Sequence, residues 1–312
     1  MSAIGNAMNL LRGAIVESSR VTFPGGAVTG ESKVLDVAML VGGKIALLLE
    51  ETPFHPVDAT WPDQPADRGM IQLKGGERTF PVEDCQIFGV HKETKDLAEM
   101  AKVPGKEKQN WFAVVAHIIN PQELEAGSFL EETVVANVDA VYRNALNTHH
   151  TGCHMAAAAL NQATHSYWSK GGARQDSLKD WDLDHEAMDT SMIFENRSED
   201  LYRFGKSIKK KGLQTEQLFS DLEKVQQAAN DFLAQWVASG APVAIQAAGP
   251  HLDDTRTWHC NLPDGREVKM FCGGSHLPSL SKIAAIQYNL EPLTVDGEKK
   301  LKATTVVTLK SE

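Results

Sequence analysis

Two short motifs in the second half of the sequence combine residue types that bind metal ions. His150-Thr-Gly-Cys-His154 spaces two histidines four residues apart, which in a helix brings both imidazoles to one face. Cys272-Gly-Gly-Ser-His276 joins a thiolate and an imidazole across a turn that the glycines allow to bend. Three histidines and a cysteine form a borderline-soft donor set that suits zinc. Either motif alone is compatible with an ordinary helix or turn, but together they predict a zinc site.

The bulk composition is that of an ordinary globular protein. The chain has 312 residues, 42% hydrophobic and 23% charged, which is enough to fill the cores of two domains. Its net charge of −10 argues against a protein that coats nucleic acid by general electrostatics, and we expect no DNA partner. Four irregularly spaced cysteines argue against a disulfide framework. No long apolar run or export signal is found, so we expect a cytoplasmic protein with no membrane partner.

Short β-rich runs separated by Gly and Pro fill the first part of the sequence. They lie at residues 13–17, 32–40, 44–49, 69–73 and 79–90, and they predict a small β-barrel or sandwich. The stretch 91–109 is rich in Lys and Glu and resembles a connection between domains. We therefore predict a first domain over residues 1–105.

The remaining residues, 106–312, predict a mixed domain. Helical spacing extends over residues 138–168, which include the first motif, and over 215–238 ahead of Gly240. Strand-like runs follow at 242–248, 267–271, 282–288 and 303–309. The predicted fold class is α+β: a small N-terminal β-barrel domain, then a zinc-binding α+β domain with an antiparallel sheet and long helices.

Both motifs resemble those of a known family, the editing domains of alanyl-tRNA synthetase and their freestanding relatives, which are related to the editing domain of threonyl-tRNA synthetase. The family carries His-Thr-Ala-x-His and Cys-Gly-Gly-Thr-His runs. Asp139 and Arg143 precede His150 at the family's spacing. In the first domain, Thr52-Pro-Phe-His-Pro and Gln64-Pro-Ala-Asp-Arg-Gly are similar to the family's Thr-x-Phe-Tyr-Pro and Gln-Pro-x-Asp-x-Gly. The resemblance extends loosely over most of the chain.

The resemblance implies a zinc-dependent hydrolase that removes serine or glycine from mischarged alanine tRNA in trans, and so serves translation fidelity. Aminoacyl-tRNA would be its partner. Thr52 carries over as a contact for a substrate hydroxyl, with Gln64 and Asp67 on the substrate side. Thr52 is equally compatible with a strand-end threonine that bonds its own backbone, and Gln64 and Asp67 with ordinary turn residues.

Two departures from the family leave other functions open. A stiffer segment, residues 57–63 with Trp61, replaces the family's glycines, and an acidic stretch that includes Asp180, Asp182 and Asp184 would not favour tRNA. One alternative is a metal-dependent hydrolase of a small acyl or amino-acid derivative without tRNA. Another is a non-catalytic zinc-containing binding protein, since four protein ligands usually make a closed structural site.

The expected chemistry is ester hydrolysis. Zinc would lower the pKa of a bound water toward about 7 and polarise the carbonyl. The first motif lacks the Glu of the metalloprotease His-Glu-x-x-His helix, so an activated ester is a better substrate than an amide. No catalytic side chain is assigned; His55 and Asp58 are candidate bases should the first domain close over the metal. His149 is expected to face away from the site and Cys153 to pack.

Overall fold

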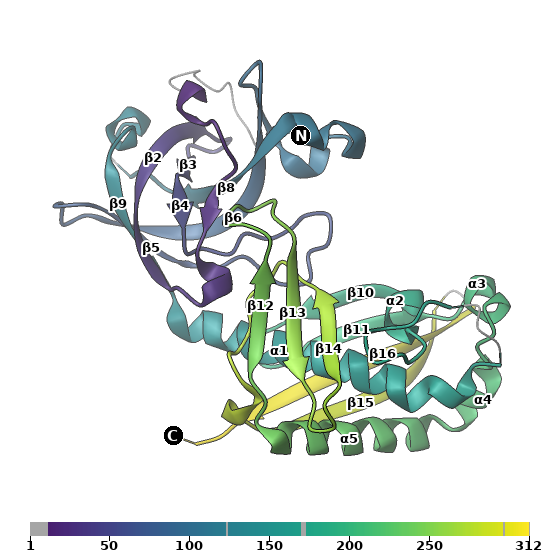
Figure 1. Cartoon of the computed structure of the whole chain (residues 1–312). Helices are drawn as coiled ribbons and strands as arrows, with labels where there is room; N and C mark the ends of the chain where they lie inside the picture. The colour runs from purple at the N-terminus through teal and green to yellow at the C-terminus, as the bar shows by residue number, and fades with distance from the viewer. Residues whose placement is uncertain (1–11, 123, 170–172, 296, 312) are drawn as a thin grey trace. The chain divides into compact units, whose positions relative to one another are not determined.

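The computed structural model describes residues 12–122, 124–169, 173–295 and 297–311, and the chain divides into two compact units (Figure 1). The first unit comprises Met1–Arg143 and Ala247–Thr255. The second comprises Asn144–Gln246 and Arg256–Glu312. Each unit has its own hydrophobic core and is described by itself.

The first unit is a closed six-stranded antiparallel barrel. Its strands follow the order β5-β9-β2-β3-β8-β6, and β6 pairs back onto β5 to close the wall. The strands are β2 (Thr29–Met39), β3 (Ile45–Leu49), β5 (Gly69–Leu73), β6 (Thr79–His91), β8 (Trp111–Ile119) and β9 (Thr133–Val138). Strand β7 (Leu97–Glu99) extends the sheet beside β6, while β1 (Arg20–Val21) and β4 (Glu51–Thr52) form a separate parallel pair. Short 3-10 helices complete the unit: η1 (Arg12–Ala14), η2 (Phe23–Gly25), η3 (Met100–Lys102), η4 (Gly105–Asn110) and η5 (Ala126–Phe129).

Strand β3 explains how the barrel is held together. All five of its residues are buried, although side chains alternate between the two faces of a strand. Ile45, Leu47 and Leu49 join the core inside the barrel, while Ala46 and Leu48 join a second cluster on the outer face. The uninterrupted apolar run of this strand is therefore a consequence of burial on both sides.

The predicted domain boundary near residue 105 is wrong. Strand β8 pairs with β3 and β6, and β9 pairs with β2 and β5, so the barrel cannot close without residues up to 138. The supposed connection at 91–109 contains β7, η3 and η4. The strand predicted at 13–17 is also wrong, since η1 occupies its start and no strand follows there.

The second unit is an α+β fold, and the predicted fold class is confirmed. A four-stranded antiparallel sheet has the order β10-β11-β16-β15, and a three-stranded sheet has the order β12-β13-β14. The strands are β10 (Met188–Ile193), β11 (Ser198–Arg203), β12 (Val243–Ala247), β13 (Arg256–Asn261), β14 (Glu267–Phe271), β15 (Ile283–Val295) and β16 (Glu298–Leu309). The helices are α1 (Ala140–Thr164), α2 (Leu183–Ala187), α3 (Lys206–Lys210), α4 (Thr215–Ser220) and α5 (Leu222–Ser239), with the 3-10 helices η6 (His165–Tyr167) and η7 (Leu280–Lys282).

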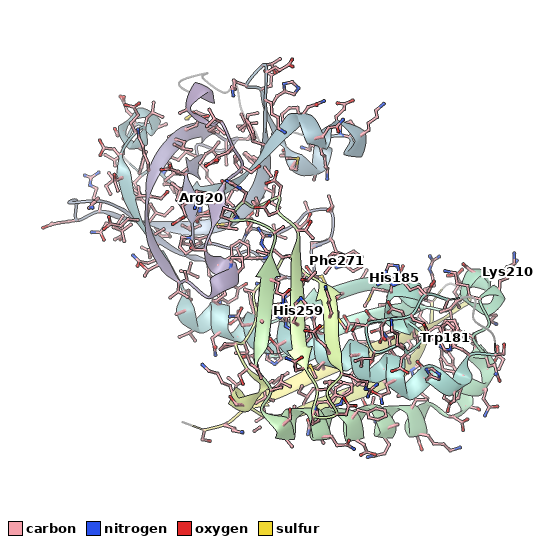
Figure 2. All side chains as sticks on the ribbon, in the orientation of Figure 1. Arg20, Trp181, His185, Lys210, His259 and Phe271 are labelled. Atoms are coloured by element: carbon pink, nitrogen blue, oxygen red, sulfur yellow. The ribbon has the colours of Figure 1, made fainter. Side chains whose placement is uncertain are left out.

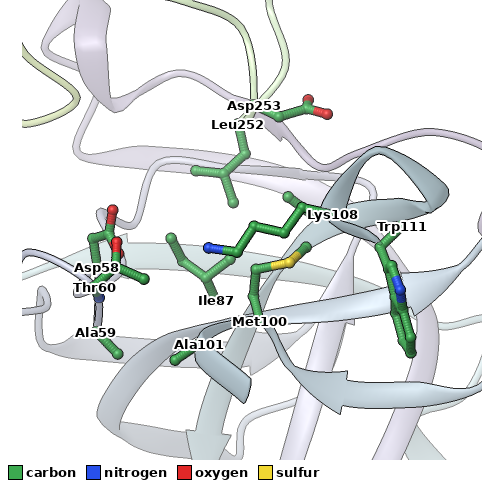
Figure 3. Close-up of a pocket in the computed structure, with 11 residues that line it drawn as sticks. Asp58, Ala59, Thr60, Ile87, Met100, Ala101, Lys108, Trp111, Leu252 and Asp253 are labelled. Carbon is green, nitrogen blue, oxygen red and sulfur yellow. Dashed lines mark hydrogen bonds between the residues drawn. The ribbon is translucent and has the colours of Figure 1, made fainter. Parts of the chain in front are cut away.

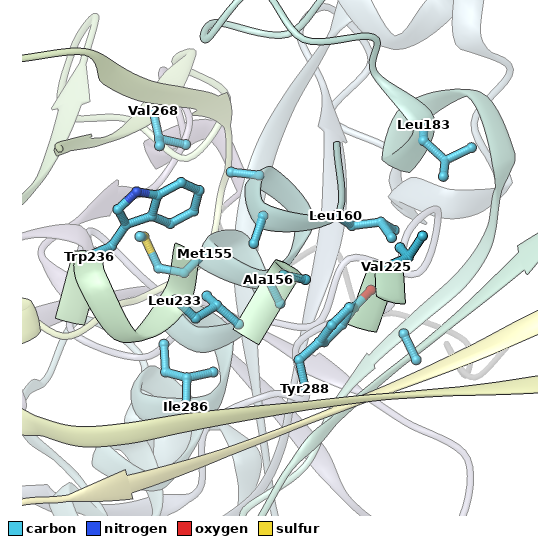
Figure 4. Packing of buried hydrophobic residues seen from close by; sticks show 14 of the residues in the cluster. Met155, Ala156, Leu160, Leu183, Val225, Leu233, Trp236, Val268, Ile286 and Tyr288 are labelled. Atoms are coloured by element: carbon cyan, nitrogen blue, oxygen red, sulfur yellow. The ribbon is translucent and has the colours of Figure 1, made fainter. Parts of the chain in front are cut away.

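Helices α1 and α5 share the core of this unit with strand β15 (Figure 4). In Figure 4, Met155 of α1 lies beside Leu233 of α5 and Leu160 lies beside Val225, and β15 contributes Ile286 and Tyr288 to the same core. Asn230 in α5 also bonds the backbone of the strand, because its side chain contacts the N–H of Tyr288 at 2.9 Å and the carbonyl at 2.8 Å. The Ala-rich part of α1 is therefore core, and it fixes the helix that carries the first motif.

The helix predicted over residues 215–238 is two helices, α4 and α5, separated at Asp221. Its predicted end is confirmed: Gly240 adopts the left-handed conformation at φ 62° and closes α5. Within the residues that the structure describes, no helix has the length and apolar character needed to cross a membrane.

Candidate metal centre

The structure brings the four predicted ligands together. His150 and His154 lie one turn apart on α1, and Cys272 and His276 lie in the segment that follows β14. One ligand atom from each residue lies within 4.8 Å of the other three. All four residues belong to the second unit, so the cluster is formed within a single folded body.

Two separations between ligand atoms are close to the edges of a tetrahedral metal site. Cys272 Sγ lies 3.5 Å from His150 Nε2 and 3.2 Å from His276 Nε2. A tetrahedron with metal–nitrogen bonds of about 2.0–2.1 Å and a metal–sulfur bond of about 2.3 Å has nitrogen–sulfur edges of about 3.6 Å. The observed separations are close to this edge. The group can therefore hold a metal ion, and its donor chemistry suits a borderline-soft one.

The three imidazole rings surround a common point and meet edge to face or at a tilt. The His150 and His154 rings meet edge to face at 4.7 Å, and His276 lies 4.1 Å from His150 and 4.7 Å from His154 between ring centroids. Burial lowers the pKa of His154 to about 3, so its ring is neutral and keeps a free lone pair. Its buried Nδ1 has no hydrogen-bond partner among the described residues. A neutral imidazole with an unused buried nitrogen is what a metal ligand requires.

Two groups outside the ligand set orient it. Thr151 accepts a hydrogen bond from the Leu277 N–H at 3.0 Å and lies 3.3 Å from His276 Nδ1. Nδ1–H of His276 can donate to this hydroxyl, which leaves Nε2 for an ion. The Gly274 N–H donates to Cys272 Sγ at 3.4 Å and so favours the thiolate. Thr151 was not among the residues predicted from the sequence, although its place inside the first motif was the available signal.

Helix α1 is fixed from its other faces by close packing. A Cβ on Gly152 would lie 2.3 Å from Val307 Cγ2, so only glycine lets α1 approach β16 this closely. Cys153 lies 3.6 Å from both carboxylate oxygens of Asp200, and burial raises the pKa of its thiol well above its usual value. Cys153 is thus an uncharged packed thiol, as predicted. His149 is also outside the cluster and bonds the Ala145 carbonyl at 3.0 Å.

Thr52 lies in the first unit with its hydroxyl fully used. The residue has no exposed surface, and its Oγ1 lies 2.7 Å from Nε2 of His117 and 3.1 Å from the Phe54 N–H. His117 Nδ1 faces the Leu47 carbonyl at 3.0 Å, so Nδ1 carries the ring proton and Nε2 must accept. Thr52 therefore donates to His117 and accepts from Phe54. Of the two interpretations of Thr52, the local hydrogen-bonding one has the direct support.

Asp67 is the centre of a buried hydrogen-bond network in the barrel unit. Its carboxylate accepts from Arg143 Nε at 2.7 Å, from a second Arg143 nitrogen, and from the His55 N–H at 2.5 Å. Arg143 also donates to the Pro53 carbonyl at 2.7 Å. Gln64 nearby in sequence is only 1% exposed. These motif residues hold the two first-domain segments to the start of α1.

Gly69 closes the same motif for a steric reason. It pairs with Val138 in β9, and a Cβ at this position would lie 2.1 Å from the Asn137 carbonyl oxygen. The glycine of the Gln-Pro-x-Asp-x-Gly run is therefore a requirement of strand pairing.

The two candidate bases also lie in the first unit. His55 is buried, and its ring meets Phe23 edge to face at 5.1 Å. Asp58 is exposed, and its Oδ1 accepts from the backbone N–H and the hydroxyl of Thr60 at 2.8 and 2.6 Å. Their role as bases stays a prediction.

The acidic stretch is largely neutralised within the second unit. Asp182 caps α2 through the His185 N–H and pairs with Arg174 at 2.9 Å. Asp180 lies 2.7 Å from His165 Nδ1. Figure 2 shows Trp181 and His185 of this segment on the same part of the unit as Lys210 of α3. The stretch is thus a folded, internally paired segment rather than a free acidic tail.

No protein-family model matches the sequence. The resemblance to the alanyl-tRNA editing family therefore rests on the motifs and stays a prediction, while the geometry of the cluster stands independently of it.

Proposed function

We propose that the protein is a zinc-dependent hydrolase that deacylates mischarged aminoacyl-tRNA, with seryl or glycyl alanine tRNA as the substrate class. The observation that carries the proposal is the convergence of His150, His154, Cys272 and His276 onto one point. The motif blocks that resemble the editing family supply the substrate class. The cluster alone supports a less specific conclusion, namely that the protein can bind a metal ion.

The residues of the cluster suit a metal ion that activates an ester toward hydrolysis. A zinc ion, when bound, polarises an ester carbonyl and lowers the pKa of water. Thr151 keeps His276 in the ligating tautomer, and the Gly274 N–H stabilises the Cys272 thiolate. These contacts hold the ligands in a fixed geometry before substrate arrives. An aminoacyl ester is more reactive than an amide, so a metal ion without an assigned general base suits it as a substrate.

The test combines metal content with turnover. Purified wild-type protein is expected to contain about one equivalent of zinc and to release serine from seryl alanine tRNA. Cys272→Ala removes one ligand, so both metal content and release should fall to background. Cys260→Ala is the matched control, since Cys260 is a buried thiol of β13 outside the cluster, and it should retain both.

Two other outcomes separate the alternatives. Zinc with turnover of small amino-acid esters, but none of seryl-tRNA, would replace the tRNA substrate by a small acyl compound. The four-ligand set itself favours a second candidate, a non-catalytic zinc protein, because such sets usually leave no open position. Zinc bound without turnover of any ester would establish that candidate and reject the hydrolase.

A further inference from the structure

The barrel unit contains a cavity at one end of its wall, with a volume of about 250 Å³ (Figure 3). Strand β3 pairs only with residues 116–119 of β8, and β5 only with residues 79–82 of β6. The β6–β8 ladder continues beyond both of them, to the pair His91 and Trp111. The cavity lies on this projecting ladder, at the mouth of the barrel, where ligand sites of small barrels commonly occur.

The floor of the cavity continues the interior face of the barrel. Cys85 and Val115 belong to the barrel core, and Ile87 and Ala113, which line the cavity, are two residues farther along the same strand faces. Beyond them, Gly89 makes room for the wall: a Cβ there would lie 2.9 Å from the Trp111 ring and 3.2 Å from Met100. The floor is therefore apolar because it is the uncovered end of a core.

The opposite wall is provided by Leu252, whose backbone N–H donates to the Ser19 carbonyl at 2.9 Å. Figure 3 shows its side chain directed into the cavity, facing Ile87 and Met100. Apolar groups thus approach from two sides.

Charges of both signs stand over this apolar floor. Lys108, on η4, extends across the cavity toward Asp58 in Figure 3. Lys108 forms no ion pair with the part of the chain that the structure describes, so its ammonium can receive an anion. Asp58 keeps its Oδ1 on the 58–60 turn, and Asp253 adds a second carboxylate to the rim. A bare phosphate or a nucleic acid would meet two negative charges for one positive charge.

We propose that this cavity binds a free amino acid with an apolar side chain. The carboxylate of the ligand would contact Lys108, its ammonium Asp58, and its side chain the floor formed by Ile87, Ala113 and Trp111. The volume is below the range of drug-sized pockets and suits a metabolite of roughly ten non-hydrogen atoms. This site lies wholly in the first unit, and the proposal does not depend on the metal cluster or on hydrolysis.

The experiment uses three probes that share the leucine side chain and differ in which end is charged: leucine at both ends, leucinamide at the ammonium and N-acetylleucine at the carboxylate. Titration calorimetry of the full chain should show leucine binding most tightly, because it alone satisfies both charges. Lys108→Met should weaken leucine and N-acetylleucine by about tenfold and leave leucinamide unchanged. Asp58→Asn keeps the acceptor for Thr60 and should instead weaken leucine and leucinamide. Lys106→Met, on the same η4 helix but outside the cavity lining, is the control and should bind all three as the wild type does.

Three results would overturn the proposal. One is the absence of leucine binding at millimolar concentration in folded wild-type protein. Another is equal binding of leucine and leucinamide that Lys108→Met does not change, since Lys108 would then not contact the ligand carboxylate. The third is loss of leucine binding in Cys272→Ala, which would move the site to the metal cluster. Retained binding in that variant supports the barrel site even when the hydrolase proposal fails.

Discussion

The two units use buried polar side chains in opposite ways. In the barrel, Thr52 is matched with His117, and Asp67 with Arg143, so donors and acceptors satisfy one another. In the second unit, one ligand atom from each of three imidazoles and the sulfur of Cys272 lie within 4.8 Å of one another. Such a set of nitrogen and sulfur ligand atoms around one point can hold a metal ion. The structure distinguishes the two sets: the barrel residues bond one another, whereas the four ligand atoms surround one point.

The largest effect is expected from removing the Arg143 partner of Asp67 in the barrel unit. Arg143→Met leaves the Asp67 carboxylate buried with an uncompensated charge, and we expect a loss of about 3–5 kcal/mol in the free energy of unfolding. Hydrogen exchange measured by mass spectrometry should show the loss in barrel peptides. Arg68→Met, at an exposed ion pair with Asp139, is the control and should cost less than about 1 kcal/mol. A loss below about 1 kcal/mol for Arg143→Met would show that the Arg143–Asp67 pair does not stabilise the barrel.

Acid should weaken the barrel through His117. Burial lowers the pKa of His117 from 6.5 to about 4, so the unfolded chain binds more protons than the folded one between these values. Stability is therefore complete above pH 6.5 and falls by about 3 kcal/mol as the pH drops to about 4. His117→Gln should flatten this part of the profile, measured by denaturant unfolding at each pH. The exposed His185→Gln should leave the slope in place, and an unchanged slope in His117→Gln would reject this assignment.

The second unit should respond to pH with the opposite sign. Burial, and next the charge of Asp200, raise the pKa of Asp184 from 3.8 to about 7, and the Tyr202 hydroxyl donates to it at 2.8 Å. The folded form retains the proton, so this contribution to stability falls as the pH rises from about 4 to about 7. Asp184 is partly exposed, so we expect less than its pKa shift alone implies. Asp184→Asn should raise stability at pH 8 relative to pH 5; exchange in α2 and β11 peptides that keeps the wild-type pH dependence would contradict this.

The smallest expected effect tests how tightly the ligand helix is seated. Gly152→Ala places a methyl group against Val307, an overpacking cost of about 1–3 kcal/mol that is offset by about 1 kcal/mol of helix propensity. We expect a net loss of about 1 kcal/mol in chemical denaturation, together with weaker metal retention against a chelator. Gly127→Ala has open space around the new Cβ and should change neither. Tighter metal retention in Gly152→Ala would show that α1 is not limited by β16.

The prediction from sequence was most accurate where local pattern and burial agree. Strands β5 and β14 were located to the residue, and the end of α5 was signalled by Gly240. Strands β10 and β11 were missed, because Met188–Ile193 and Ser198–Arg203 are polar-rich and become strands by pairing with each other and with β16. The domain boundary failed for a related reason: the partners of β8 and β9 lie far away in sequence.

The ligand set of the candidate metal site could be predicted from the sequence, because ligand type and spacing within each motif are local properties of a helix and a turn. The tertiary structure decided which polar residues are available. Thr52 and His117 are 65 residues apart and Asp67 and Arg143 are 76 apart, and no local pattern records such pairings. A side chain can offer its hydrogen-bonding groups to a ligand only if the fold has not already used them, and that is settled by which distant segments the core brings together.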